Sequence, residues 1–376
     1  MLNQKCEIFL PVDSYIEPLL IRVLSNDKLG ISYETIKADS VSSSCGKQKG
    51  DRFKLSIPYA RQILTWNVFF DSQCPEMGPD FIFNDNFLAD MDVDILSNKI
   101  PSLAKWNPNN EDALLNVLME LLSCYKEYQI QLLQKQVELE REYSTLMKTE
   151  IRLQDVEIIL LPFGSKPTEA KFLISLSVDL SQLQNYSCKS ENYVAILIVT
   201  YCGTNWSRII SHLHLTKPLE DVLGGTNAMQ LPNFPRNKFL FDYVTEVKKF
   251  ITEKINSLAQ SLTKRRNFIG GLLSNHYYAL IEYDTEDYTY ATLLFDVEDF
   301  HFVVYIQLPL GFPQERLIVS LQSIYHMKDQ CVPYTEQIKN FPYNAQWEPY
   351  RMIKKLMKHI LCSSKDFKYN SIKTCS

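Results

Sequence analysis

The stretch from Leu64 to Phe83, LTWNVFFDSQCPEMGPDFIF, decides how the rest of the chain is interpreted. Every second residue from 64 to 70 is large and apolar, which predicts a strand with one buried face. Pro75 and Pro79 follow, and proline cannot donate a hydrogen bond to a sheet. The chain must therefore leave the sheet at the two prolines before Phe81–Phe83 returns to it as a short strand.

The same order occurs a second time far downstream. Residues 302–321 read FVVYIQLPLGFPQERLIVSL. An apolar strand is followed by Pro309 and Pro313, four residues apart, and then by a second apolar strand. The prolines again predict a crossing between two strands of one sheet.

A Trp-x-Pro triplet follows each pair of prolines at a similar distance. Trp106–Pro108 begins 31 residues after Pro75 (106 minus 75), and Trp347–Pro349 begins 34 residues after Pro313 (347 minus 313). Proline in the first turn of a helix has no hydrogen bond to lose, so each triplet predicts the start of a helix. Two matched sets of landmarks predict a duplicated domain.

Length and composition bound the architecture. A chain of 376 residues with a duplicated unit at each end predicts three domains, over residues 1–150, 151–274 and 275–376. The composition is that of a globular protein, and a net charge of -5 offers no electrostatic footprint for nucleic acid. No apolar run suits a membrane span, the N-terminus shows no signal peptide, and nine cysteines without regular pairs predict reduced thiols inside the cell.

Apolar spacing predicts the remaining elements. In the first domain we expect a short helix at Glu17–Leu29, a polar loop at Ala38–Gly50, a strand at Lys54–Pro58 and a long helix at Glu111–Met147. In the middle domain we expect strands at Val156–Leu161, Lys171–Val178 and Tyr193–Tyr201, then a helix at Asp242–Leu273. In the last domain we expect strands at Ala279–Tyr283, Tyr290–Val297, Phe302–Leu308 and Val319–Ile324, a helix at Trp347–Leu361 and a frayed polar tail from Cys362. The two long helices are candidate docking sites, the alternative being helices that pack only on a neighbouring domain.

The order strand, proline crossing, strand, loop, Trp-x-Pro and helix resembles the ubiquitin-conjugating-enzyme fold in its variant (UEV) and RWD forms. The whole chain resembles the brain and reproductive organ-expressed (BRE) family. The segments that carry the resemblance are DRFKLSIPYA at Asp51–Ala60, Trp106–Pro108, Leu231–Tyr243, Lys264–Arg266 and Ser323–Tyr343. The resemblance implies an α+β fold of tandem UEV/RWD-like domains. Each would be an antiparallel meander sheet with flanking helices, the middle domain being a degenerate copy.

The resemblance also implies a function. BRE-like proteins are non-catalytic scaffold subunits of the BRISC and BRCA1-A complexes, which cleave lysine-63-linked ubiquitin chains. The implied partners are a zinc-dependent JAMM-type protease, an Abraxas-type MPN scaffold, a von Willebrand A-type (vWA, MERIT-type) adaptor and ubiquitin, with no cofactor held by this chain. The implied settings are DNA-damage response and checkpoint control in the nucleus and signalling or spindle functions in the cytoplasm. DNA repair, the cell cycle and apoptosis are the processes implied. Two other classes stay open: a stand-alone ubiquitin- or peptide-binding UEV module, and a UEV cofactor of a conjugating enzyme.

A conjugating enzyme needs a cysteine thiolate shortly before the Trp-x-Pro helix. Cys74 lies beside the first pair of prolines, and Cys124 lies on the apolar side of the following helix. Cys331 precedes Trp347 by 16 residues (347 minus 331), too far for the family pattern, and no His-Pro-Asn triplet accompanies it. We therefore expect an inactive variant, with Cys331 as the alternative nucleophile.

The other polar motifs predict structure rather than chemistry. His212 and His214 share one face of a strand, but no third or fourth ligand lies at zinc-like spacing. Lys264–Arg266 predicts a solvated helix face, with an acidic partner or ubiquitin as the alternative. Gly224–Gly225 and Gly270–Gly271 lack the residues of a phosphate loop, and we expect a turn and a helix irregularity there.

Aromatic residues and prolines gather before the last helix. Pro333 and Pro342 lie among five rings, those of Tyr325, Tyr334, Phe341, Tyr343 and Trp347. This composition suits a groove for an extended, proline-bearing peptide of a partner. The alternative is that most of these rings pack the loop onto its own domain.

Overall fold

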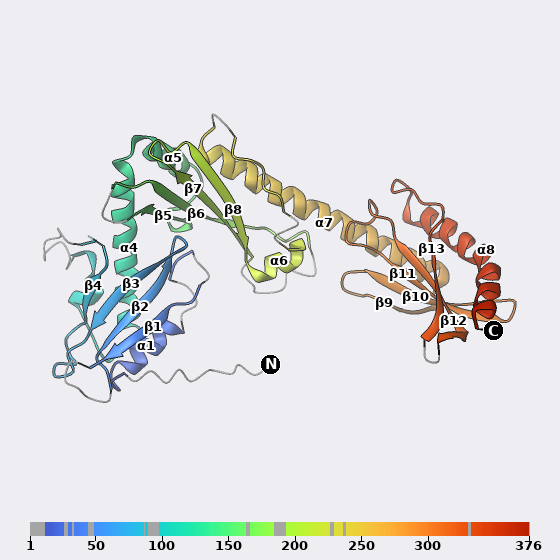
Figure 1. Ribbon diagram of the computed structural model, residues 1–376, viewed down its shortest axis with the longest axis horizontal. Coiled ribbons are helices and arrows are strands. Elements are labelled where there is room, and N and C mark those ends of the chain that lie inside the picture. Colours follow the sequence, from blue (N-terminus) through green and yellow to red (C-terminus); the bar gives the residue numbers. More distant parts are fainter. Residues whose placement is uncertain are drawn as a thin grey trace. The chain divides into compact units, whose positions relative to one another are not determined.

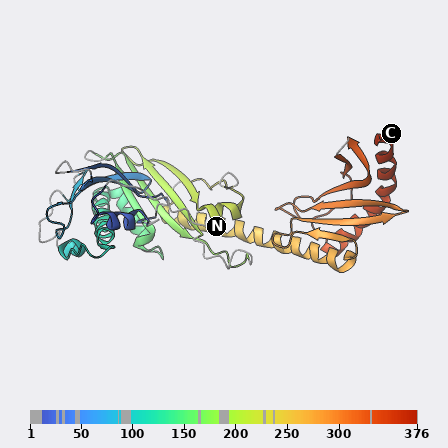
Figure 2. The same cartoon turned by 90° about the horizontal axis from the view of Figure 1, so that it is seen from below.

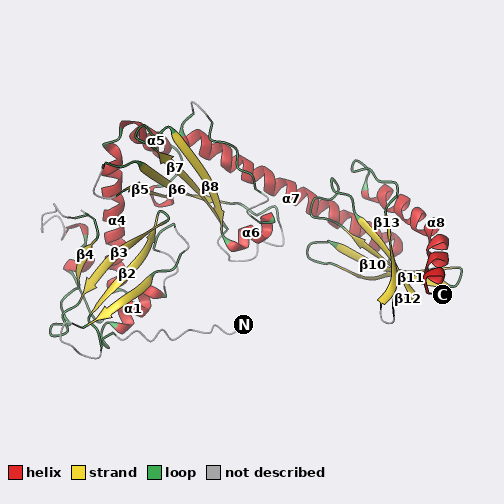
Figure 3. Ribbon diagram, in the orientation of Figure 1, coloured by secondary structure: helices red, strands yellow, loops and turns green. Residues whose placement is uncertain are grey.

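Figure 1 shows the computed structural model, which describes residues 12–25, 29–31, 34–43, 49–85, 87–88, 98–162, 166–183, 193–225, 229–235, 238–329 and 332–375. The chain forms two compact units: Met1–Val178 with Glu191–Lys249, and Asp179–Ser190 with Phe250–Ser376. Both units combine helices with antiparallel sheets (Figure 3), so the α+β class is confirmed. Every helix among these residues is too short or too polar to span a bilayer.

The first unit begins with a four-stranded antiparallel sheet in the order β1-β2-β3-β4. Its strands are β1 Lys37–Ser42, β2 Arg52–Tyr59, β3 Gln62–Phe69 and β4 Asp80–Phe83. The predicted alternation in β3 is confirmed, because Leu64, Trp66 and Val68 are buried and the residues between them are not. After the two prolines, β4 returns to pair antiparallel with β3.

The predicted loop at Ala38–Gly50 is wrong in part, because Lys37–Ser42 forms the edge strand β1. This strand pairs with β2 from Lys37 opposite Ser56 to Ser42 opposite Arg52. Its side chains are exposed or only half-buried, so no apolar alternation marks it in the sequence. Backbone pairing with β2 makes the strand, and side-chain polarity does not report backbone pairing.

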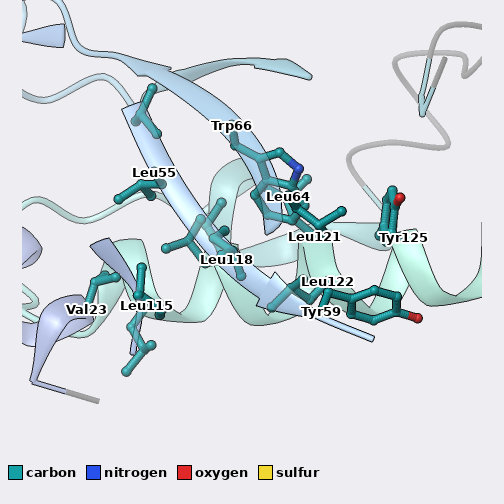
Figure 4. Packing of buried hydrophobic residues seen from close by; sticks show 14 of the residues in the cluster. Val23, Leu55, Tyr59, Leu64, Trp66, Leu115, Leu118, Leu121, Leu122 and Tyr125 are labelled. Carbon is teal, nitrogen blue, oxygen red and sulfur yellow. The ribbon is translucent and has the colours of Figure 1, made fainter. Parts of the chain in front are cut away.

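Two helices pack against this sheet, α1 (Glu17–Leu24) and α4 (Ala113–Gln134). Figure 4 shows Leu118 and Leu121 of α4 beside the strand that carries Leu64 and Trp66. Each buried leucine of this kind stabilises the packing by about 1.5–3 kcal/mol. The apolar stripe of α4 therefore fixes the helix on the sheet, as its three- and four-residue spacing predicts.

The helix predicted at Glu111–Met147 is two helices, because α4 ends at Gln134 and α5 spans Val137–Met147. Gln136 between them has an extended backbone, with φ -108° and ψ 99°. The break turns α5 toward the start of α7, where Glu142 Oε2 accepts the backbone N–H of Leu240 at 2.6 Å. Apolar spacing could not predict the break, since it lies in a polar stretch that carries no such signal.

The second sheet also belongs to the first unit and has the antiparallel order β5-β6-β7-β8. Its strands are β5 Val156–Leu161, β6 Glu169–Ser177, β7 Val194–Cys202 and β8 Arg208–Leu215. The first three match the predictions. The strand expected to carry His212 and His214 is β8, but its bounds are not predicted, because it alternates poorly between apolar and polar residues. The short helix α6 (Lys217–Leu223) is not predicted. Ile159, Leu173 and Ile196 of this sheet share one core with the first sheet.

The third sheet lies in the second unit and has the antiparallel order β13-β12-β11-β10-β9. Its strands are β9 Leu280–Tyr283, β10 Tyr290–Val297, β11 Phe300–Gln307, β12 Ile318–Asp329 and β13 Val332–Ile338. The sequence predicts the first four of these strands, but β12 is longer than expected and β13 is not predicted. The second pair of prolines lies between β11 and β12, which are antiparallel neighbours like β3 and β4.

Most of helix α7 and all of helix α8 belong to the second unit. Helix α7 (Leu240–His276) is one uninterrupted helix in Figures 1 and 2, so no irregularity occurs at Gly270–Gly271. Helix α8 runs from Pro349 to Cys375, so the prediction of a frayed tail from Cys362 is wrong. Phe367 explains the difference, because its ring is 2% exposed and packs against the rings of Phe300 and Phe302.

The structure thus contains three sheets within two compact units. The division of the chain at residues 150 and 274 stays a prediction.

Candidate functional site

The first pair of prolines forms a short crossing that packs against Trp106. Pro75 is exposed and Pro79 is buried. The ring centroid of Trp106 lies 5.9 Å from that of Phe70. A Cβ added to Gly78 would lie 3.3 Å from Cγ of Trp106, so glycine lets the crossing approach the indole closely.

In the second unit, α7 holds the other crossing through its backbone carbonyls. Ser261 Oγ donates to the carbonyl of Phe312 at 2.7 Å, and Arg265 Nη1 donates to the carbonyl of Leu310 at 3.2 Å. Arg265 is only 4% exposed, so the prediction that Lys264–Arg266 is a solvated face is wrong for its central residue. A buried guanidinium needs acceptors, and this crossing supplies them.

The two Trp-x-Pro triplets differ in how they meet their helices. Pro349 is the first residue of α8, as predicted, whereas α4 begins five residues after Pro108 (113 minus 108). Turns occupy the residues between Pro108 and α4. Trp347 is half-buried, and the guanidinium carbon of Arg351 lies 4.9 Å from its ring centroid. In the second unit Pro309 and Pro313 are also half-buried.

The five aromatic residues predicted to form a peptide groove do not share one set of contacts. Tyr325 lies on β12, is 54% exposed and accepts or donates a 2.8 Å hydrogen bond with His301 Nδ1. Tyr334 lies on β13 and packs on Phe367, with ring centroids 5.6 Å apart.

The other rings form a second contact group near the crossing. The rings of Phe341 and Tyr343 are 6.4 Å apart, and the guanidinium carbon of Arg316 lies 4.0 Å from the centroid of Phe341. Tyr343 donates its hydroxyl to the carbonyl of Pro313 at 2.5 Å. Phe341 is buried, so its ring packs the segment before α8 onto the domain. A peptide groove at these residues stays a prediction.

The surroundings of Cys74 and Cys124 do not activate their thiols. Nearby Asp71 is the main cause that raises the pKa of Cys74, and burial raises the pKa of Cys124. A nucleophilic cysteine needs a lowered pKa, which positive neighbours supply. Cys202 and Cys362 are free thiols as well. Cys331, the alternative nucleophile, lies outside the described residues.

The histidine pair and the first glycine pair have structural surroundings. His212 is exposed and His214 is half-buried on β8, where burial and then Arg61 lower the pKa of His214. Across the described ranges, no cluster of three or more His, Cys, Asp or Glu residues is placed to hold a metal ion. Gly224 follows α6 with a left-handed φ of 82°, which confirms the predicted turn at Gly224–Gly225.

A buried acid that the motif search did not select ties the two sheets of the first unit together. Glu157 of β5 is 3% exposed, and its carboxylate accepts the N–H of Ile31 at 2.7 Å and of Ala60 at 2.9 Å. A Cβ on Gly30 would lie 2.2 Å from Glu157 Oε1, so glycine at this position lets the carboxylate come close to the backbone. Burial raises the pKa of Glu157. The available signal was a lone carboxylate inside the apolar strand VEIILL.

Comparison with known proteins identifies the family. The family model for brain and reproductive organ-expressed protein (BRE) matches residues 11–327. This chain belongs to the BRE family. The match covers all of the first two sheets and most of β12, so the expected resemblance to the BRE family is confirmed.

Curated relatives extend the similarity to nearly the whole chain. A zebrafish (Danio rerio) protein named BRISC and BRCA1-A complex member 2 is 32% identical over 354 residues, which cover 90% of this chain and 90% of the relative. A lancelet (Branchiostoma floridae) protein of the same name is 32% identical over 372 residues, which cover 95% of each chain.

Proposed function

We propose that this chain is a non-catalytic subunit of BRISC- and BRCA1-A-type complexes. The observation that carries the proposal is the length of the similarity, because relatives with that name align with 90% and 95% of the chain. The aligned share is large enough to include most of the surface of both units. A similarity over nearly the whole chain supports the role of a complex subunit, which depends on large surfaces, better than a role that depends on one motif.

We propose further that the subunit acts as a scaffold, bridging a JAMM-type protease and an Abraxas-type MPN protein to a vWA-type adaptor. In this arrangement the protease supplies the zinc and the chemistry, and this chain supplies surfaces. The surroundings of Cys74 and Cys124 support a non-catalytic role, since both thiols have raised pKa values. We expect the complexes to work in both nucleus and cytoplasm.

The tandem UEV/RWD architecture belongs to the same proposal. What supports it is the equivalent place of the two crossings, each between antiparallel neighbours, β3 with β4 and β11 with β12. Each crossing is also followed by a tryptophan and a long helix, α4 in one case and α8 in the other. The second sheet would be the degenerate copy, without a Trp-x-Pro helix.

Reconstitution tests the proposal. The full-length chain is co-expressed with the JAMM protease, the Abraxas-type protein and the vWA adaptor, and cleavage of lysine-63-linked di-ubiquitin is measured with and without it. A scaffold should co-purify with all three proteins, and its omission should lose the adaptor and lower cleavage. If the three partners assemble and cleave equally well without the chain, the scaffold role is refuted.

The alternative classes give different results in the same purified system. A UEV cofactor would speed chain synthesis by a conjugating enzyme, and a ubiquitin-binding module would bind monoubiquitin as the isolated chain. An active conjugating enzyme would form a reducible ubiquitin adduct with an activating enzyme, and Cys331→Ala would abolish the adduct. Any of these results would count against a purely structural subunit.

A further inference from the structure

A hollow of about 650 Å³ opens in the second unit, where α7, the start of α8 and the turn between β9 and β10 meet. We call it the Gly270 hollow. It is lined, among others, by Arg266 and Gly270 of α7, Tyr283 and Tyr288 beside the turn, and Glu348 and Tyr350 at the start of α8. Its size lies within the range of ligand sites, and three tyrosines supply amphipathic walls.

The fold itself does not require a glycine at the floor of this hollow. Glycine inside a helix costs about 1 kcal/mol relative to alanine. At Gly271 the packing explains the glycine, because an added Cβ would lie 2.6 Å from Cδ1 of Ile353. At Gly270 an added Cβ would meet no atom within 4 Å. The space beside Gly270 is therefore open, and without a side chain there a foreign group can approach the helix backbone closely.

A row of cations continues from the hollow along α8. Four basic side chains of α8 are exposed, those of Arg351, Lys354, Lys355 and Lys358. None of the carboxylates in the described ranges forms an ion pair with them. Lys354 follows Tyr350 by one helical turn and shares its stripe. We call these four residues the cationic face of α8.

This charge pattern is unfavourable for the isolated helix. The cationic face lies in the first turns of α8, whose first turn has no acidic residue. Like charges three and four residues apart repel, and the positive end of the helix dipole disfavours cations there. Lys365, further along α8, contrasts with them, since it pairs with Glu298 at 2.7 Å. An uncompensated cluster of this kind is stabilised by a negatively charged partner.

We propose that the Gly270 hollow and the cationic face of α8 together bind an acidic segment of a partner protein. A bulky apolar side chain of that segment lies over Gly270 between Tyr283 and Tyr350, and its carboxylates meet Lys354 and Lys358. An aromatic or aliphatic anchor in a hollow with charges at the rim is the usual anatomy of a protein docking site. The surface binds such a segment whether or not the chain enters the complexes proposed above.

A polypeptide suits this surface better than a nucleic acid. Glu348 is itself among the lining residues, and Glu286 and Asp287 stand in the adjacent turn between Tyr283 and Tyr288. A nucleic acid carries a phosphate at every nucleotide and would meet these carboxylates. An acidic peptide can place its carboxylates on the α8 side alone.

The test measures binding of a fluorescein-labelled peptide, Asp-Glu-Glu-Phe-Glu-Asp-Glu, to the full-length chain by fluorescence anisotropy. Gly270→Leu fills the hollow with a good helix former and should weaken binding about tenfold, and Gly270→Ala should weaken it less. Lys354→Glu should weaken binding about fivefold and flatten its salt dependence. Gln260→Leu, on an exposed site of α7 outside the hollow, and Lys339→Glu, an exposed charge outside α8, are the matched controls and should bind as wild type.

Several results would overturn the proposal. Absence of saturable binding, or equal binding by Gly270→Leu and wild type, would remove the hollow as a site. Equal binding of a peptide with serine in place of phenylalanine would reduce the effect to non-specific charge. Tighter binding of a single-stranded oligonucleotide that displaces the peptide would assign the surface to nucleic acid. Self-association of the chain that Gly270→Leu abolishes would assign it to a second copy.

Discussion

Gln129 links helix α4 to strand β5 of the second sheet, and its loss should destabilise the first unit measurably. The side chain is fully buried on α4, where Oε1 accepts the N–H of Leu160 at 3.0 Å and Nε2 donates to the hydroxyl of Tyr125 at 3.0 Å. Strand β5 is an edge strand, so among the described residues no neighbouring strand accepts the outward N–H of Leu160. The side-chain oxygen of Gln129 accepts this N–H in place of a strand's carbonyl.

The change Gln129→Met keeps the side-chain length and removes both hydrogen bonds. A buried N–H left without an acceptor costs about 1–3 kcal/mol, and losing the bond to the tyrosine costs about 0.5–1.5 kcal/mol more. A volume-conserving replacement adds little cavity cost. We expect the free energy of unfolding to fall by about 2–4 kcal/mol, which lowers the Tm of a unit of this size by roughly 5–15 °C.

Urea unfolding followed by tryptophan fluorescence measures the effect. Trp66, Trp106 and Trp206 belong to the first unit, so a Trp347→Phe background reports that unit alone. The matched control is Gln131→Met, an exposed change two residues along the same helix, which should stay within about 0.5 kcal/mol of the background.

Hydrogen exchange gives a local readout of the same bond. The amide of Leu160 should exchange faster in Gln129→Met, because it loses its acceptor. The reasoning is refuted if Gln129→Met unfolds at the same urea concentration as Gln131→Met and the amide of Leu160 keeps its protection.

Three further predictions concern single residues. Phe367→Ala should lower the unfolding free energy of the second unit by about 3–5 kcal/mol, since it empties a buried ring site; a loss below about 1 kcal/mol by urea unfolding would contradict the role given to this ring. The Gly270→Ala variant should be more stable than Gly271→Ala by about 1–3 kcal/mol, since only the second change brings a Cβ into contact with Ile353 of α8. Equal urea midpoints would contradict this, because they would show that α7 and α8 move apart without cost. Burial raises the pKa of Glu157 above its ordinary 4.5, so the folded chain holds a proton that the unfolded chain releases. The stability of wild type relative to Glu157→Gln should therefore be greatest below that value and fall as the pH rises through the raised pKa of the folded chain. A difference that is constant or rises with pH would be inconsistent with a raised pKa.

Where side chains alternate between a buried and an exposed face, the sequence predicted the element well. Apolar residues are buried at regular spacing in strands β3, β10 and β11 and in helices α4 and α7. The periodicity of apolar residues in the sequence therefore predicts these elements, because it follows from which side chains are buried. Polar and half-exposed elements were missed for the same reason. Strands β1 and β13 are edge strands that bury little, and they exist because a neighbouring backbone pairs with them.

The features of the candidate site also fall into those that the sequence predicts and those that only the structure shows. The sequence supplied the proline crossings and the Trp-x-Pro triplets, and with them the family. It predicted that Arg265 lies on a solvated helix face, and it predicted one helix irregularity for Gly270 and Gly271 together. In the structure Arg265 is buried against carbonyls, and only one of the two glycines faces a neighbouring helix.

The amino-acid sequence by itself determined the α+β class, the repeated crossings and the family of this protein, because these depend on local spacing and on what proline can and cannot bond. Only the tertiary structure decided which polar groups are buried, where a long helical pattern breaks, and which glycine leaves a surface open. Those properties depend on contacts between residues far apart in the chain, such as Gln129 with Leu160 and Glu157 with Ile31, whose partners no local pattern names.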